Sequence, residues 1–181
     1  MDGIFKDVRP MDAVLAIALS ALGVALMVMN INADVSDTKD LEHAITNQSW
    51  LMLPVFLGAT IPVLWRRRNV VAVALASTVV LGAHLLAFDW VIRCGAALPL
   101  SFVLAYSVGK LAQKRESYIG IAVVIVGQFL SLVKDSAAGL EILPFTAVIA
   151  LAAWGVGLYV QQQTAKRADR AGVETPTGAH A

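Results

Sequence analysis

The sequence contains six long apolar runs, at residues 13–31, 50–65, 70–88, 90–111, 118–133 and 142–160. A helix rises about 1.5 Å per residue, so runs of this length cross or nearly cross a hydrocarbon layer about 30 Å thick. Strands of a membrane barrel would alternate apolar and polar residues, and an open sheet would leave backbone groups unpaired in lipid. The runs therefore predict an all-α, polytopic membrane protein with a bundle of six transmembrane helices.

The composition supports a membrane protein and excludes several functional classes. Hydrophobic residues make up 58% of the chain and charged residues only 15%, which is too little polar surface for a soluble domain of this length. The formal net charge is +1, so no nucleic-acid partner is expected. Cys94 is the single cysteine, and no disulfide can therefore form within the chain.

The basic residues predict the orientation in the membrane. Three consecutive arginines, Arg66, Arg67 and Arg68, separate the second apolar run from the third. If the N-terminus is cytoplasmic, eleven of the fourteen Lys and Arg residues lie on the inner side, as the positive-inside rule requires. Lys114 and Arg115 contribute to the same bias. We therefore expect both termini to lie in the cytoplasm and the protein to be multi-pass in the bacterial inner membrane.

This topology divides the chain into three parts. Residues 1–12 form a cytoplasmic segment, residues 13–160 the six-helix transmembrane domain, and residues 161–181 a polar cytoplasmic tail whose first half continues the sixth helix. The last ten residues are expected to be disordered because they are polar and rich in Gly, Pro and Thr. The first run is longer than the apolar region of a signal peptide and lacks a small-residue cleavage site, so it is expected to stay in the membrane.

Motifs for catalysis or cofactor binding are not found. The chain has no glycine-rich phosphate loop, no Gly-x-Ser-x-Gly and no His-Glu-x-x-His, so we expect neither an enzyme nor a bound cofactor. The histidines are too widely separated for a metal site. Residues 34–45 alternate acids like a calcium loop, but Lys39 stands where such a loop needs glycine and Ile45 where it needs glutamate.

Four polar residues near or within the apolar runs are candidates for sensing. Ionisable groups at membrane depth are costly and often functional. His84 lies near the outer end of the third run, where it is either a proton or ligand sensor or a neutral imidazole bonded to a neighbouring helix. Asp89 and Arg93 are spaced i,i+4 and would pair if one helix contained both. Gln128 is expected to bond across to another helix.

Three stretches resemble a known family. These are "LWRRR" at residues 64–68 after a proline-containing helix, "LPLSFVLAYSVG" at residues 98–109, and "AAWGVGLYVQQQ" at residues 152–163. Together they resemble the membrane-embedded N-terminal region of actinobacterial sensor histidine kinases. After Arg170 there is neither a phosphoacceptor histidine with a neighbouring acid nor an ATP-binding domain, so the resemblance implies a sensing module without the family's kinase activity.

Two functions from different classes follow. The first is a sensor-like or regulatory membrane module of a two-component system, which signals through its last helix to a separate kinase or response regulator and forms a homodimer. The second is the substrate-binding membrane subunit of a vitamin-type transporter, because residues 21–25, "ALGVA", have the small-xxx-small spacing with which such subunits dock a scaffold partner. The lipid bilayer surrounds the bundle in either case.

Overall fold

The computed structural model describes residues 8–34 and 41–173, and the elements of secondary structure in these residues are helices. The six α-helices are α1 (Pro10–Ile31), α2 (Met52–Thr60), α3 (Val70–Phe88), α4 (Cys94–Leu111), α5 (Lys114–Leu132) and α6 (Leu143–Val173). Two short 3-10 helices, η1 (Ile61–Trp65) and η2 (Leu140–Ile142), continue α2 and precede α6. Most of the acidic segment considered as a calcium loop, and the end of the polar tail, lie outside the described residues.

Five of the six helices are long and apolar enough to cross a membrane, namely α1, α3, α4, α5 and the helical stretch that contains α6. The second apolar run forms a shorter helical unit, Met52–Trp65, because the helix tightens into η1 at Ile61. Pro62 lies in the first turn of η1, where it can donate no hydrogen bond to continue α2. The predicted all-helical class is thus confirmed in the described residues, and five of the six predicted runs form helices long and apolar enough to cross a membrane.

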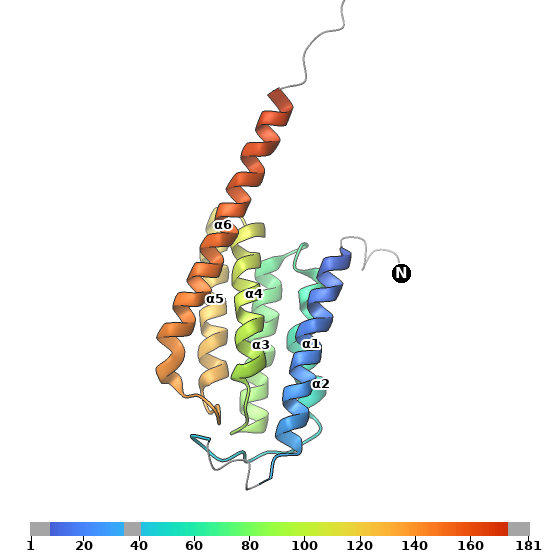
Figure 1. Cartoon of the computed structure of the whole chain (residues 1–181), viewed down its shortest axis with the longest axis vertical. Coiled ribbons are helices and arrows are strands. Elements are labelled where there is room, and N and C mark those ends of the chain that lie inside the picture. The colour runs from blue at the N-terminus through green and yellow to red at the C-terminus, as the bar shows by residue number, and fades with distance from the viewer. Residues whose placement is uncertain (1–7, 35–40, 174–181) are drawn as a thin grey trace, which may run out of the picture.

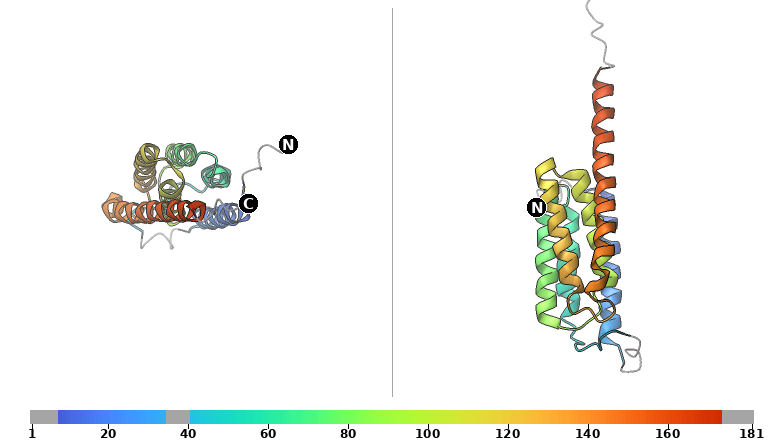
Figure 2. Two further views of the ribbon diagram at one scale, coloured as in Figure 1. Left: turned by 90° about the horizontal axis from the view of Figure 1, so that it is seen from above. Right: turned by 90° about the vertical axis from the view of Figure 1, so that its left-hand side faces the viewer.

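The helices form a layered bundle around α4. Figure 2, seen from above, shows α1 and α6 on one face and α2, α3 and α5 on the other, with α4 between the two layers. Helix α6 runs past the end of the bundle, so the prediction that the sixth helix continues into the polar tail is confirmed up to Val173. The N-terminal end of α1 lies at the same end of the bundle as this extension (Figure 1).

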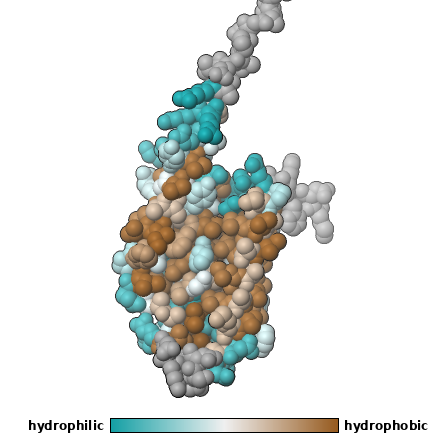
Figure 3. Space-filling model, viewed as in Figure 1, coloured by the Kyte–Doolittle hydropathy of each residue, from teal (hydrophilic) through white to brown (hydrophobic). Residues whose placement is uncertain are grey.

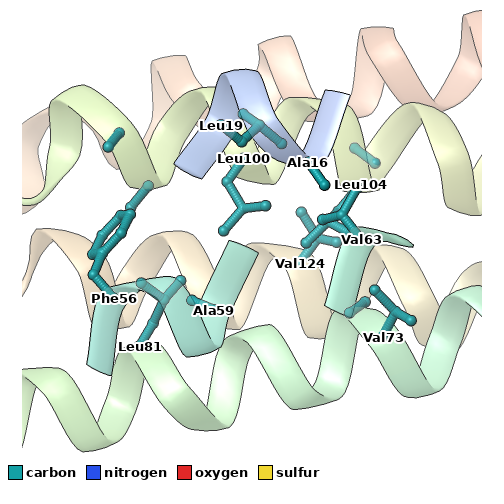
Figure 4. Packing of buried hydrophobic residues seen from close by; sticks show 14 of the residues in the cluster. Ala16, Leu19, Phe56, Ala59, Val63, Val73, Leu81, Leu100, Leu104 and Val124 are labelled. Carbon is teal, nitrogen blue, oxygen red and sulfur yellow. The ribbon is translucent and has the colours of Figure 1, made fainter. Parts of the chain in front are cut away.

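The core lies where α4 meets its neighbours. Figure 4 shows Leu100 and Leu104 of α4 among side chains of α1, α2, α3 and α5, and all the side chains labelled there belong to one buried apolar cluster. Burial of this kind contributes about 25 cal/mol per Å² in water, but between helices in lipid the gain comes from close packing. Small residues permit that packing.

Two glycines bring α4 and α6 into backbone contact. A Cβ on Gly109 would overlap the Trp154 carbonyl oxygen, and a Cβ on Gly157 would overlap the Tyr106 carbonyl oxygen and lie 2.9 Å from the Lys110 nitrogen. Because the clashing atoms belong to the backbone, no side-chain rotation could relieve them. The crossing of α4 and α6 therefore requires glycine at both positions.

An apolar belt surrounds the bundle. Figure 3 shows hydrophobic surface over the body of the molecule and hydrophilic surface on the α6 extension and at the two ends. Large apolar side chains point outward from α1 and α6, among them Ile17, Met29, Phe145, Val148 and Tyr159. Soluble monomers rarely expose contiguous apolar patches this large, so the belt fits a hydrocarbon environment.

Candidate functional site

A buried arginine organises the end of the bundle that lies opposite the α6 extension. Arg93 precedes α4 and has no exposed surface. Its Nε–H donates to Nδ1 of His84 over 3.1 Å, its Nη1 to the carbonyl of Lys134 over 2.8 Å, and its Nη2 to the carbonyl of Asp89. One guanidinium thus joins the end of α3, the start of α4 and the loop that follows α5. We call these four residues the Arg93 cluster.

Asp135 holds the backbone that surrounds this cluster. Its Oδ2 accepts hydrogen bonds from the backbone N–H groups of Arg93 and Cys94, over 2.6 and 2.7 Å, at the start of α4. Its Oδ1 accepts from the N–H groups of Ala137 and Ala138, over 3.0 and 3.1 Å. A fully buried carboxylate is stable here because both oxygens are satisfied and it faces the positive end of the α4 dipole.

The geometry determines which nitrogen of His84 carries hydrogen. An arginine can only donate, so Nδ1 must accept and the neutral ring carries its hydrogen on Nε2. The ring packs edge-on against Phe56 of α2 and at a tilt against Phe88, with ring centroids 5.9 and 4.7 Å away. Nε2 is buried and has no hydrogen-bond partner among the described residues. His84 thus forms a hydrogen bond with the residue that precedes α4, and its role as a sensor stays a prediction.

The condition for an i,i+4 pair between Asp89 and Arg93 is not met, because no single helix contains both residues. Helix α3 ends at Phe88 and Asp89 takes a positive φ of 51°, so the two residues lie on either side of a turn. The Asp89 carboxylate instead pairs with Lys134 Nζ over 2.7 Å, and both side chains are about half exposed. The only Asp89 atom to which Arg93 donates a hydrogen bond is the backbone carbonyl oxygen.

The charge on Arg93 persists at neutral pH. Burial lowers the pKa of its guanidinium to about 10, while the Asp135 and Asp89 carboxylates act in the opposite direction. Because a pKa of about 10 is still well above 7, the buried cation is present under ordinary conditions. The cluster is therefore a site of permanent positive charge facing a neutral imidazole.

Gln128 does not belong to this cluster. Its Nε2 donates to Ser101 Oγ of α4 over 2.9 Å and to the Thr146 carbonyl of α6 over 3.3 Å, which confirms the predicted bond to another helix. Its Oε1 is buried without a partner among the described residues. Gln128 thus links α5 with both α4 and the first turns of α6.

A second charged centre lies at the opposite end of the bundle. Asp12 of α1 is fully buried and accepts from Arg66 Nε at Oδ1 over 2.8 Å and from Arg67 Nε at Oδ2 over 2.7 Å. Arg66 also donates to Ser107 of α4 over 3.0 Å. The sequence pattern predicts these arginines only as determinants of topology. Arg68 completes the same turn through its backbone N–H, which donates to the Trp65 carbonyl over 2.9 Å.

From the sequence alone, Asp12 belongs only to the predicted cytoplasmic segment of residues 1–12. A carboxylate buried without a partner at the start of a membrane helix would be energetically costly. An acid in that position, in a chain that also contains a three-arginine turn, could therefore have identified Asp12 as a partner of the arginines. Lys114 and Arg115, the other predicted topology residues, lie exposed in the first turn of α5.

The family model of a domain of unknown function, DUF7134, matches residues 8–164. The chain belongs to the DUF7134 family. The match covers α1 to α5 in full and α6 as far as residue 164. Neither the curated proteins nor the solved structures contain a match to this chain.

The part of this DUF7134 domain that the structure describes holds no group of three His, Cys, Asp or Glu side chains placed to bind a metal ion. The two charged centres instead use backbone groups and arginines as partners for acids and for an imidazole. These hydrogen bonds join helices and loops that are distant in the sequence.

Proposed function

We propose that this DUF7134 domain is a regulatory module of the bacterial inner membrane, in which six helices cross the bilayer and both termini are cytoplasmic. The basic turn at Arg66–Arg68 and the start of α5 lie at the same end as the α6 extension, which agrees with the positive-inside rule. The module passes a signal through its last helix to a separate partner. The resemblance to the input regions of sensor histidine kinases supports the same proposal.

The unbroken course of α6 carries this proposal. The helix is 31 residues long, begins at the same end of the bundle as the start of α4, and continues to Val173 beyond the opposite end. A continuous helix transmits displacement or rotation along its axis, whereas a loop at the membrane boundary would absorb it. Input at one end of the bundle can thus reach the polar extension at the other.

The Arg93 cluster is connected to α6 through the loop after α5. Lys134 and Asp135, both bonded to Arg93, begin this loop, and η2 leads from it into α6. A stimulus that favoured a different arrangement of the cluster would reposition the start of α6 by population shift. The proposed input residues are therefore His84, Asp89 and Arg93. Farther into the bundle, Gln128 couples α5 to α6 through its hydrogen bond to the Thr146 carbonyl.

The first experiment is co-purification of the full chain from native membranes in mild detergent, with bound proteins and small molecules identified by mass spectrometry. We expect a histidine kinase or a response regulator, and we expect it to be lost when residues 161–181 are deleted. Deletion of residues 174–181 alone is the matched control, because it leaves α6 whole and should retain the partner. If the partner is recovered equally with both deletions, the α6 extension is not the segment that passes the signal to it.

One observation favours the transporter alternative. A groove of about 480 Å³ runs along α1 and is lined by small apolar residues that include Ala13, Ala16 and Ala21, next to Ile61 and Leu64 of η1. Such a surface would suit a helix of a scaffold subunit. Recovery of ATPase and scaffold subunits, or of a stoichiometric vitamin, in the same co-purification would replace the regulatory proposal with this one.

A further inference from the structure

A cleft of about 290 Å³ lies between the first turn of α5 and the part of α6 that leaves the bundle. It is separate from the Arg93 cluster, which lies at the other end of the molecule, and from the Asp12 centre, none of whose residues lines it. One wall is aromatic and aliphatic, and the rim is polar and basic. A surface of this mixed kind at the end of an apolar belt has the chemistry of a lipid headgroup site.

The apolar wall is held rigidly. Trp154 Nε1 donates to Ser117 Oγ over 2.7 Å, and the Trp154 and Tyr118 rings lie 5.5 Å apart at a tilt. With its N–H already satisfied, the indole presents an apolar face, and Leu158 extends that face along α6. Tryptophan and tyrosine favour the membrane–water boundary, so the wall is suited to glycerol and the first acyl carbons of a lipid.

The rim has donors that the protein does not use. Lys114 is exposed and has no ion-pair or hydrogen-bond partner among the described residues, and the Gln162 side chain is likewise unbonded there. Gln161 uses its Nε2 to donate to the Ala112 carbonyl over 3.0 Å, which ties α6 to the α4–α5 turn. The residues that line the cleft include no carboxylate. An anion is therefore the complementary ligand.

We propose that this cleft binds an anionic phospholipid, with the phosphate at Lys114 and Gln162 and the glycerol and proximal acyl carbons along Tyr118, Trp154 and Leu158. A soluble phosphate would use the rim but leave the apolar wall uncovered, which is why the lipid is the better fit. The proposal requires the helices to cross a bilayer, but it does not depend on a signalling role. It places a lipid against α6 at the point where the helix separates from the bundle.

The test is native mass spectrometry of the full chain, released from detergent that contains equal amounts of phosphatidylglycerol and phosphatidylcholine. We expect preferential retention of phosphatidylglycerol. Lys114→Gln should reduce this preference about fivefold, which corresponds to about 1 kcal/mol for one lysine at an anionic surface. Lys166→Gln, on the α6 extension beyond the cleft, should leave it unchanged, and Lys114→Arg should preserve it because the charge remains.

Fluorescence locates the bound lipid. Phosphatidylglycerol brominated on its acyl chains should quench tryptophan emission more strongly than brominated phosphatidylcholine, and the difference should disappear in Trp154→Phe. Equal retention of the two lipids, or an unchanged preference in Lys114→Gln, would overturn the proposal. Displacement of the lipid by inorganic phosphate would assign the cleft to a soluble anion and overturn it as well. None of these results depends on finding a partner kinase.

Discussion

Asp12 and Arg93 show how single charges are held inside an apolar bundle. Burying an ion in a low-dielectric interior costs several kcal/mol unless hydrogen bonds replace its hydration. Each carboxylate oxygen of Asp12 accepts a hydrogen bond from an arginine, whereas Arg93 donates to an imidazole and two carbonyls. Each residue therefore joins elements that are far apart in sequence, and each should matter more to stability than an exposed ion pair.

Asp12→Asn should destabilise the protein by about 3 kcal/mol, because removing one partner of a buried pair leaves the other uncompensated. The amide keeps one acceptor but turns a donor toward a guanidinium, so one arginine loses its bond. The measurement is the free energy of unfolding from SDS titration in mixed micelles, followed by circular dichroism. Glu116→Gln is the matched control, since Glu116 is exposed and should change stability by less than about 0.5 kcal/mol.

Equal stability of the Asp12 and Glu116 variants would contradict the assignment of Asp12 as the residue that ties α1 to the arginine turn.

The contacts of the candidate site residues were less predictable from the sequence than the candidate residues themselves. His84 and Arg93 were recognisable because ionisable residues stand out in apolar runs, and both lie in one cluster. Their partners were not, since Asp135 is 42 residues from Arg93 and its carboxylate binds backbone N–H groups, which have no sequence signature. Asp12 was overlooked for the same reason, because its partners lie 54 and 55 residues away.

Among the elements, the α4–α6 pair depends most on exact residue size. Gly109 and Gly157 let the two backbones touch, and Trp154 then reaches Ser117 of α5 from the same stretch of α6. The three helices α4, α5 and α6 are joined here by packing and by one side-chain hydrogen bond. A change at this crossing should therefore affect α6 as a whole.

Gly157→Ala should destabilise the bundle by about 2 kcal/mol, as overpacking of a close contact does, because the new methyl group meets backbone atoms of α4. Gly155→Ala is the matched control on the same helix. A Cβ at Gly155 meets nothing within 4 Å, so this variant should be neutral or more stable by up to about 1 kcal/mol. Thermal unfolding in detergent compares the two.

A loss of similar size in both variants would show that helix propensity, and not the α4 contact, governs this part of α6.

The ends of a helix were predicted correctly from the sequence where hydropathy alone determines them. The third run, 70–88, coincides with α3, whose start is capped by the Asn69 side chain accepting from the Ala72 N–H over 2.9 Å. The predicted start of the fifth run at residue 118 was too late, because a helix begins with polar residues that hydropathy excludes, and α5 begins at Lys114. The fourth run was predicted to start at residue 90, but the turn that contains Arg93 delays α4 to Cys94.

At the scale of the whole molecule, the two ends are hydrophilic and the surface between them is apolar (Figure 3). The arginine turn and the first turn of α5 lie at the end from which α6 projects, while Asp89, Asp135 and Glu141 lie at the other. This polarity is the basis of the proposed orientation, and it can be tested independently of function.

A membrane-impermeant maleimide should label Glu141→Cys in intact cells but should label Lys166→Cys only after the membrane is permeabilised. Both changes are made in a Cys94→Ser background, and that background alone is the control, since it contains no thiol. Both positions are exposed in the structure. The reverse labelling pattern would invert the topology and place the α6 extension outside the cytoplasm.

The glycine crossing gives α6 the mechanics of a lever. Gly157 is the fulcrum, and the arm from there to Val173 is sixteen residues, or about 24 Å at about 1.5 Å per residue. A tilt of about 5° at the fulcrum would move the far end of such an arm by about 2 Å, which is comparable to the helix shifts that switch subunit interfaces. Small rearrangements at the crossing are in this way enlarged at the far end of the α6 extension.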